Sequence, residues 1–112
     1  MVAHLSFPNV TEDYTPASHS SYFVTDLLRG ELGFRGVVIT DSQQKGAIAY
    51  NFGAEAAVKA LQAGCDMIYR PEDLPAAVQA VLDALANGEL TQERIDESVL
   101  RILMLKYGAG LE

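Results

Sequence analysis

The amino-acid sequence predicts an α/β fold in which three short parallel strands alternate with helices. The first observation is residues 37–40, a β-branched apolar run that a glycine precedes and the carboxylate of Asp41 follows. This pattern is typical of a strand buried on both faces. The second is a pair of similar runs, residues 2–7 and 66–70, each of which stops at a proline. The third is the helical spacing of apolar residues between the runs, because parallel strands require crossover connections.

The central run leads to the first candidate site residue. Residues 37–40 are short enough to form one turn of a buried helix instead, but the flanking glycines and the β-branched content favour a strand. In α/β proteins, ligands and chemistry lie at the carboxyl ends of strands. Asp41 occupies that position, so its carboxylate is the first candidate for function.

The N-terminal part predicts one strand, one loop and one helix. Residues 2–7 form the first strand, and residues 9–16 form a polar loop. Serines within residues 18–21 are N-cap candidates for an amphipathic helix over residues 22–29, which ends at the glycines of residues 30–33. We expect the aromatic rings of Tyr22 and Phe23 to lie in the core.

The C-terminal part predicts a loop and three helices. Residues 42–53 form the loop that Asp41 enters, and a helix over residues 55–63 ends at Gly64. The next helix begins with the acidic residues 72–73 and runs to about residue 86. Thr91 caps the last helix. The predicted buried stripe of this helix is Ile95, Val99, Ile102, Leu103 and Leu105.

Composition limits the classes of protein to which the chain can belong. The 112 residues are 49% hydrophobic and 21% charged, which indicates one globular unit. A net charge of −7 argues against nucleic acid and anionic membranes as partners, and no apolar run reaches membrane-spanning length. Cys65 is the only cysteine, so we expect a buried thiol and no disulfide. No phosphate loop, zinc spacing or nucleotide fingerprint is present, so we expect no metal and no cofactor.

Five blocks of sequence occur in an order that resembles a known family. The most specific is residues 26–41, Asp-Leu-Leu-Arg-Gly-Glu-Leu-Gly-Phe-Arg-Gly-Val-Val-Ile-Thr-Asp. The others are Ala-His-Leu-Ser-Phe-Pro at 3–8, Pro-Ala-Ser at 16–18, Ala-Gly-Cys-Asp-Met at 63–67 and the start of the last helix at 94–103. Together they resemble the C-terminal part of the catalytic barrel of glycoside hydrolase family 3, in its bacterial β-N-acetylglucosaminidase branch.

The resemblance implies a fold, a reaction and a nucleophile. It implies that residues 1–110 are part of a TIM-type (β/α) barrel, with about three of its eight strands and an extra C-terminal helix; we expect residues 111–112 to be a cloning remnant. The family's nucleophile follows the seventh strand, a position that Asp41 matches. Its carboxylate would attack the anomeric carbon and form a covalent glycosyl-enzyme that water hydrolyses. The implied partner is a carbohydrate, terminal N-acetylglucosamine of cell-wall or chitin-type oligosaccharides.

Four other polar residues have weaker assignments. His4 matches the family's Ala-His motif and is a candidate to line the sugar site, although a histidine hydrogen-bonded in the barrel wall is an equal alternative. We expect Asp66, at the start of the third strand, to be structural. Asp96 and Arg101 are expected to form ion pairs or caps in the last helix.

The resemblance also implies that essential parts of the site lie outside the sequence. In this branch the general acid/base is a histidine paired with an aspartate on an upstream loop, and no such pair occurs here. The loss of a general acid alone costs about 10²–10⁴ in rate. We therefore expect this chain to be inactive by itself.

Three residues depart from the family pattern. Gln43 and Lys45 follow the nucleophile, and His19 follows Pro-Ala-Ser, where the family is usually apolar. Natural drift explains this, as does engineering of a truncated barrel, which would replace newly exposed apolar side chains.

A sheet of three strands has two open edges, which predicts a homo-oligomer. Two hypotheses therefore remain: the nucleophile-bearing part of a hexosaminidase, or a fragment that serves as a folding and self-association module. A small flavodoxin-like binding protein fits the alternation of strands and helices but not the family blocks.

Overall fold

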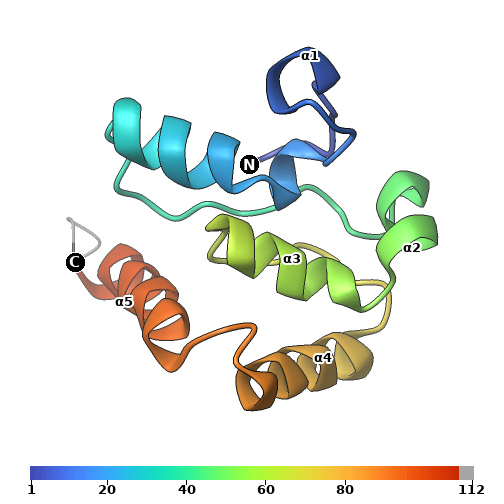
Figure 1. Ribbon diagram of the computed structural model, residues 1–112. Coiled ribbons are helices and arrows are strands. Elements are labelled where there is room, and N and C mark those ends of the chain that lie inside the picture. Colours follow the sequence, from blue (N-terminus) through green and yellow to red (C-terminus); the bar gives the residue numbers. More distant parts are fainter. Residues whose placement is uncertain (109–112) are drawn as a thin grey trace.

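The computed structural model describes residues 1–108, which form helices packed around a small core (Figure 1). The residues expected to be a cloning remnant, 111–112, lie outside this range. In chain order the helices are α1 (Pro8–Thr11), η1 (Ala17–His19), η2 (Tyr22–Glu31), α2 (Gly46–Phe52), α3 (Glu55–Ala63), α4 (Leu74–Asn87) and α5 (Gln92–Tyr107). Helix α3 lies at the centre and packs against η1, η2, α2 and α4.

The last three helices confirm the prediction and its capping residues. Helix α3 ends at Gly64, whose φ of 118° is the left-handed conformation that favours glycine. The side chain of Asp73 accepts a hydrogen bond from the backbone N–H of Ala76 at the start of α4. Thr91 accepts one from Arg94 at the start of α5. Local signals of this kind are sufficient to place these helices.

Two predicted loops contain short helices. Helix α1 begins at Pro8, and α2 lies inside the expected loop of residues 42–53. Ile48 in α2 is fully buried and anchors this segment to the core. In the described chain α2 begins at Gly46 without a side-chain N-cap and is followed by Gly53, so the local sequence gives no clear sign of a helix. The predicted helix over residues 22–29 is present as η2, a wider π-helix in which the N–H of Leu32 bonds to the carbonyl of Leu27.

The three expected strands are reduced to isolated pairings. Within residues 1–108 the backbone forms two parallel bridges, Val2 with Thr40 and Ile39 with Met67. An antiparallel bridge joins Ser6 to Pro16. The middle segment therefore lies between the other two and runs parallel to both, as predicted, but none of the three is a regular strand. The more detailed prediction, three regular strands that form part of a (β/α) barrel, is not confirmed.

Side chains explain why the pairing stops. After the bridge at Met67, the next ladder bond would join the N–H of Tyr69 to the carbonyl of Thr40. The N–H of Tyr69 instead donates to the Thr40 hydroxyl, at 3.1 Å. On the other side, the imidazole of His4 takes the Asp41 carbonyl, at 3.1 Å, where a backbone N–H would bond in a regular ladder. The ladder thus ends where the candidate site residues begin.

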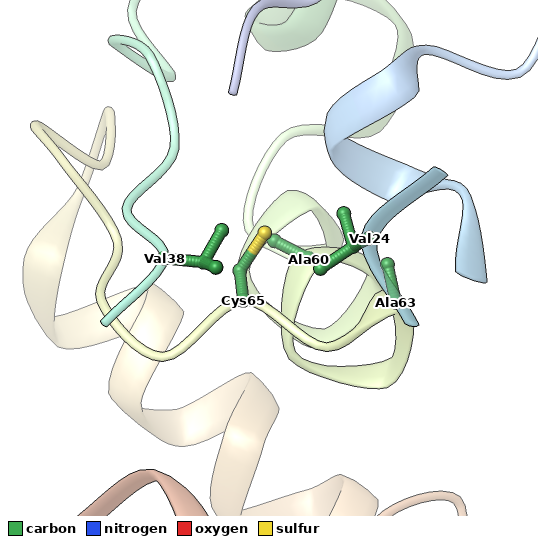
Figure 2. Close-up of a cluster of buried hydrophobic side chains, with 5 residues drawn as sticks. All are labelled: Val24, Val38, Ala60, Ala63 and Cys65. Atoms are coloured by element: carbon green, nitrogen blue, oxygen red, sulfur yellow. The ribbon is translucent and has the colours of Figure 1, made fainter. Parts of the chain in front are cut away.

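The core consists of small side chains from all three segments and two helices. Figure 2 shows Val38, Cys65 and three helical residues, Val24, Ala60 and Ala63, in one cluster. A second cluster joins α3 to α4 and to Leu90. The Cys65 thiol is buried, as predicted, and burial raises its pKa to about 12, so it is not a reactive thiolate.

The orientation of α5 differs from the prediction. Val99, Leu103 and Leu105 of the expected buried stripe are 46–50% exposed, and the buried residue of α5 is Ser98. The reason is a polar contact: Ser98 bonds to the buried carboxylate of Asp66 and turns its own side of the helix inward. The expectation that Tyr22 lies in the core is also wrong, because this ring is 42% exposed and packs against the half-buried Phe23.

Among the described helices, none combines the length and the apolar character needed to cross a membrane.

Candidate functional site

The carboxyl ends of the paired segments bring Asp41 and His4 together. The backbone N–H of Asp41 donates to the Val2 carbonyl at 2.9 Å, which places Asp41 one residue past the bridge. Its carboxylate has two donors: the N–H of Ser42 bonds to Oδ1 at 2.7 Å, and the Lys45 ammonium bonds to Oδ2 at 2.6 Å. The Asp41 side chain is 22% exposed, so solvent and ligands reach it.

These contacts keep Asp41 in its charged form. The hydrogen bond from Lys45 lowers the pKa of the Asp41 carboxyl most, and the bond from the Ser42 backbone lowers it further. Both donors favour the carboxylate over the neutral acid. Asp41 is therefore ionised at neutral pH, which is the form that acts as a nucleophile.

His4 contacts protein groups through both ring nitrogens. Nε2 lies 3.1 Å from the Asp41 carbonyl and 2.9 Å from the Ser42 carbonyl. Carbonyl oxygens only accept, so Nε2 carries a proton. Nδ1 lies 2.6 Å from the hydroxyl of the buried Ser18. The ring is thus held beside the candidate nucleophile, between η1 and the loop that follows Asp41.

The three departures from the family pattern all lie near this site. Lys45 bonds directly to Asp41. The ring of His19 lies 6.4 Å from that of His4 and 4.7 Å from that of Phe52, and within residues 1–108 neither of its nitrogens has a hydrogen-bond partner. Gln43 is 3% exposed, and its Nε2 also has no partner in this described range. Two of the three departures therefore place unpaired polar atoms inside the protein.

Burial determines the charge of His19. Desolvation lowers its pKa to about 4, and the nearby charges of His4 and Lys59 act in the same direction. The imidazole is consequently neutral at pH 7. It also borders a cavity of about 330 Å³ lined by Ser21, Lys59 and Gln62 among others.

Two residues of the site were not predicted from the sequence. Ser18 belongs to the Pro-Ala-Ser block but was interpreted only as a possible helix cap, whereas it bonds to His4 across 14 residues of sequence. Arg70 has a φ of +47°, unusual for a residue with a side chain, and its guanidinium bonds to the Gln44 side chain at 2.9 Å. The predicted strand over residues 66–70 required extended backbone at this position instead.

Asp66 lies away from this site and is structural, as its position at the start of the third segment indicated. Its carboxylate is inaccessible to solvent and accepts hydrogen bonds from Val38, Ser98, Arg29 and Arg101. Arg101 forms the expected ion pair within α5 with Glu97, at 4.0 Å, and a shorter one outside the helix with Asp66, at 2.9 Å. Asp96 instead accepts a hydrogen bond from Gln92 within α5.

No group of three or more His, Cys, Asp or Glu side chains in residues 1–108 is arranged to hold a metal ion. The chemistry of the site is that of one ionised carboxylate with an adjacent ammonium group and imidazole. Such a site can supply a nucleophile to a sugar.

Comparisons with known proteins identify the same region in other enzymes. The family described as "Glycosyl hydrolase family 3 N terminal domain" matches residues 1–105. A β-hexosaminidase of Vibrio cholerae is 43% identical over 96% of this chain and 31% of its own length. A lysosomal β-glucosidase of Dictyostelium discoideum is 41% identical over 83% of this chain and 12% of its own length. The solved family 3 β-N-acetylglucosaminidase of Paenibacillus sp. is 46% identical over 89% of this chain, with a TM-score of 0.83.

The chain thus spans less than a third of the β-hexosaminidase and an eighth of the β-glucosidase. It covers 20% of the Paenibacillus structure.

Proposed function

Since the chain belongs to glycosyl hydrolase family 3, a family of glycoside hydrolases, we propose that it is the nucleophile-bearing part of a retaining β-N-acetylhexosaminidase. The proposed substrate is terminal N-acetylglucosamine of cell-wall or chitin-type oligosaccharides. The names of the Vibrio and Paenibacillus relatives support this choice over glucose. The β-glucosidase relative makes glucosides the alternative substrate.

The observation that carries the proposal is the position and charge of Asp41. The residue follows the middle segment, where barrel enzymes place catalytic groups, and two hydrogen bonds hold its carboxylate ionised. In the proposed reaction, Oδ2 attacks the anomeric carbon, the glycosidic bond breaks and a glycosyl ester forms. Water then attacks the same carbon and the ester bond to Asp41 breaks, while a proton of the water passes to the group that had protonated the leaving oxygen. The sugar is released with its original anomeric configuration and the carboxylate is free again.

Lys45 must leave Oδ2 before this oxygen attacks. Its side chain is 58% exposed, and an exposed ion pair contributes little to stability, so a sugar can displace the ammonium group at small cost. Ser42 can continue to hold Oδ1 in the same step. Lys45 therefore stabilises the resting carboxylate without blocking the reaction.

We infer that the proton donor for the leaving group comes from outside the described residues, because no group in the resting site is free to supply it. The donors on Asp41 are a backbone N–H and an ammonium group, and both nitrogens of His4 are engaged. Without acid assistance a poor leaving group departs about 10²–10⁴ more slowly. We infer that the chain alone does not hydrolyse such substrates.

Hydrolysis of two chromogenic N-acetyl-β-glucosaminides tests this proposal. The nitrophenyl glycoside needs acid assistance more than the dinitrophenyl glycoside does. Both are assayed with the chain alone and with a chimera in which the chain replaces the corresponding 31% of the Vibrio β-hexosaminidase. We expect the chimera to be active, its Asp41→Ala variant to lose activity by at least about 10⁴, and the chain alone to leave the nitrophenyl glycoside intact.

The matched control is Asp83→Ala, which removes an exposed carboxylate from α4. It should leave the activity of the chimera unchanged. Equal activity of the folded Asp41→Ala chimera and its parent would contradict the proposal. If the chimera preferred the corresponding glucosides, the substrate would be a glucoside, the alternative named above.

A second candidate function, self-association, has one specific observation in its favour. Helix α4 carries an apolar groove of about 250 Å³ that includes Leu74, Val78 and Leu82, each more than half exposed. We propose that the isolated chain covers this face with a second copy. Light scattering should then give a mass of at least two chains, which Val78→Glu with Leu82→Glu lowers to one and the polar control Gln79→Glu does not. A monomer at all concentrations would contradict this.

A further inference from the structure

We propose that His4 and Ser18 form a clamp that positions Asp41, so that His4 is a positioning residue and not a ligand of the sugar. The importance of the clamp for catalysis rests on the proposed function of Asp41, whereas the clamp itself is inferred from hydrogen bonds. Both ring nitrogens of His4 take part in it, and so does Ser18, which the sequence indicated only as a possible helix cap.

The clamp acts on the peptide group between Asp41 and Ser42. The carbonyl of this group accepts a hydrogen bond from His4 Nε2 at 3.1 Å, and its N–H donates to Asp41 Oδ1 at 2.7 Å. Because a peptide group is planar, fixing the direction of the carbonyl also fixes the direction of the N–H. His4 therefore determines where the donor to the carboxylate points without touching the carboxylate.

A second contact makes the orientation of this loop more specific. Nε2 also lies 2.9 Å from the carbonyl of Ser42, so one N–H is shared between two successive carbonyls. The N–H of Asp41 is held on the other side by the Val2 carbonyl. The backbone of the candidate nucleophile is thus fixed before and after its side chain.

Ser18 fixes the histidine in turn. Its hydroxyl lies 2.6 Å from Nδ1, and in the neutral ring it donates to this nitrogen because the proton is on Nε2. Ser18 is fully buried in η1, and its carbonyl lies 3.6 Å from the sulfur of Cys65 in the core. The ring is therefore anchored to the core through one nitrogen and to the site through the other.

The clamp also explains why the regular ladder stops at Asp41. In a parallel pair, the Asp41 carbonyl would accept from the backbone N–H of His4. The imidazole takes that carbonyl instead and reaches one residue further, to Ser42. The departure from a regular strand is the structural feature that allows one side chain to hold the loop.

Nuclear magnetic resonance on the 112-residue chain tests the clamp in three variants. His4→Gln retains an N–H donor near the position of Nε2, His4→Phe retains the bulk without a donor, and Ser18→Ala removes the anchor. The readouts are the titration of the Asp41 carboxyl carbon, the hydrogen exchange of the Ser42 amide and the nitrogen shifts of His4. None of them requires enzymatic activity.

We expect His4→Phe to raise the pKa of Asp41, because the Ser42 donor is no longer aligned, and to speed exchange at Ser42 by about fivefold, the factor for one ordinary hydrogen bond. His4→Gln should restore most of both effects. Ser18→Ala should leave the proton on Nε2, which the two carbonyls require, and change the nitrogen shift of Nδ1, which loses its hydrogen-bond donor. Asp13 is the internal control, since the Thr15 N–H lowers its pKa in the same way at a distant place.

Unchanged Asp41 titration and Ser42 exchange in folded His4→Phe would overturn the proposal. So would a parent chain in which neutral His4 carries its proton on Nδ1, a result that needs no variant. A clamp that is present while Asp41→Ala leaves the chimera active would instead contradict the proposed function alone.

Discussion

Two aspartates next to opposite ends of the middle segment contrast a structural carboxylate, Asp66 of the third segment, with Asp41, the proposed nucleophile. Asp66 lies at the amino end, is inaccessible, and is held by donors from η2, α5 and the middle segment. Asp41 lies at the carboxyl end, is partly exposed, and among the described residues has donors from its own loop alone. The two carboxylates thus differ in their contacts: Asp66 links elements that are distant in the sequence, whereas the exposed side of Asp41 is accessible to a ligand.

The pKa of each carboxyl is below its ordinary value, but the balance of causes differs. For Asp66 the largest effect is burial, which raises the pKa, and the bonds from Ser98, Val38 and Arg101 together outweigh it. For Asp41 the bonds from Lys45 and Ser42 lead, and burial opposes them weakly. Asp66 thus needs its partners to remain charged, while Asp41 can exchange one of its partners for a substrate.

The largest expected effect is that of Asp66→Asn. Removing one member of a buried charged network leaves the others without compensation, which typically costs about 3–5 kcal/mol. We expect most of the folding free energy of a chain with so small a core to be lost. Urea unfolding followed by circular dichroism measures this, with Asp41→Asn as the matched substitution that should change the midpoint little.

The pH dependence sharpens the same comparison. Since the folded pKa of Asp66 is lowered, its stabilisation is fully present above the unfolded value of about 3.9 and is lost as pH falls through the lower folded value. The difference between the parent and Asp66→Asn should therefore shrink below about pH 4. Equal midpoints for the two variants at pH 7 would contradict the contrast between the two aspartates.

His19→Leu is expected to change the free energy of unfolding by an intermediate amount and, unlike Asp66→Asn, to increase it. Its folded pKa of about 4 lies below the unfolded value of 6.5, so the unfolded chain binds more protons between these values and stability falls as pH drops from 6.5 to 4. Leucine removes this loss and the unpaired nitrogens, which should gain about 1 kcal/mol at pH 7. Thermal unfolding at pH 7 and pH 5 measures both effects, and a larger gain at pH 7 than at pH 5 would contradict this explanation.

The smallest expected effect on stability is that of Lys45→Met, because the Lys45–Asp41 ion pair is exposed. The pKa of Asp41 should nevertheless rise, since Lys45 is the main cause of its lowering. Titration of the Asp41 carboxyl carbon detects this change. An unaltered titration would show that Ser42 alone holds the charge. Lys59→Met, which removes a charge that does not shift the pKa of Asp41, is the control.

The contrast between the two ends also explains which features could be predicted from the sequence. Helices α3, α4 and α5 follow from local caps such as Thr91, and the position of Asp41 at the end of the middle segment follows from the β-branched run before it. The clamp of His4 on Ser42 joins residues 38 apart, and the bond of Ser98 to Asp66 joins residues 32 apart. Contacts between residues so far apart leave no local pattern in the sequence. For this reason the sequence did not predict where the parallel pairing ends, or that Val99, Leu103 and Leu105 of α5 are exposed.

The central claim is that Asp41 is the carboxylate that attacks the sugar. Its most direct test is to trap the glycosyl-enzyme in the chimera with a 5-fluoro N-acetylglucosaminyl fluoride, whose excellent leaving group needs little acid assistance, and to locate the adduct by peptide mass spectrometry. We expect one sugar per chain, attached to the peptide that contains Asp41 and absent in Asp41→Ala. An adduct on a different carboxylate would contradict it.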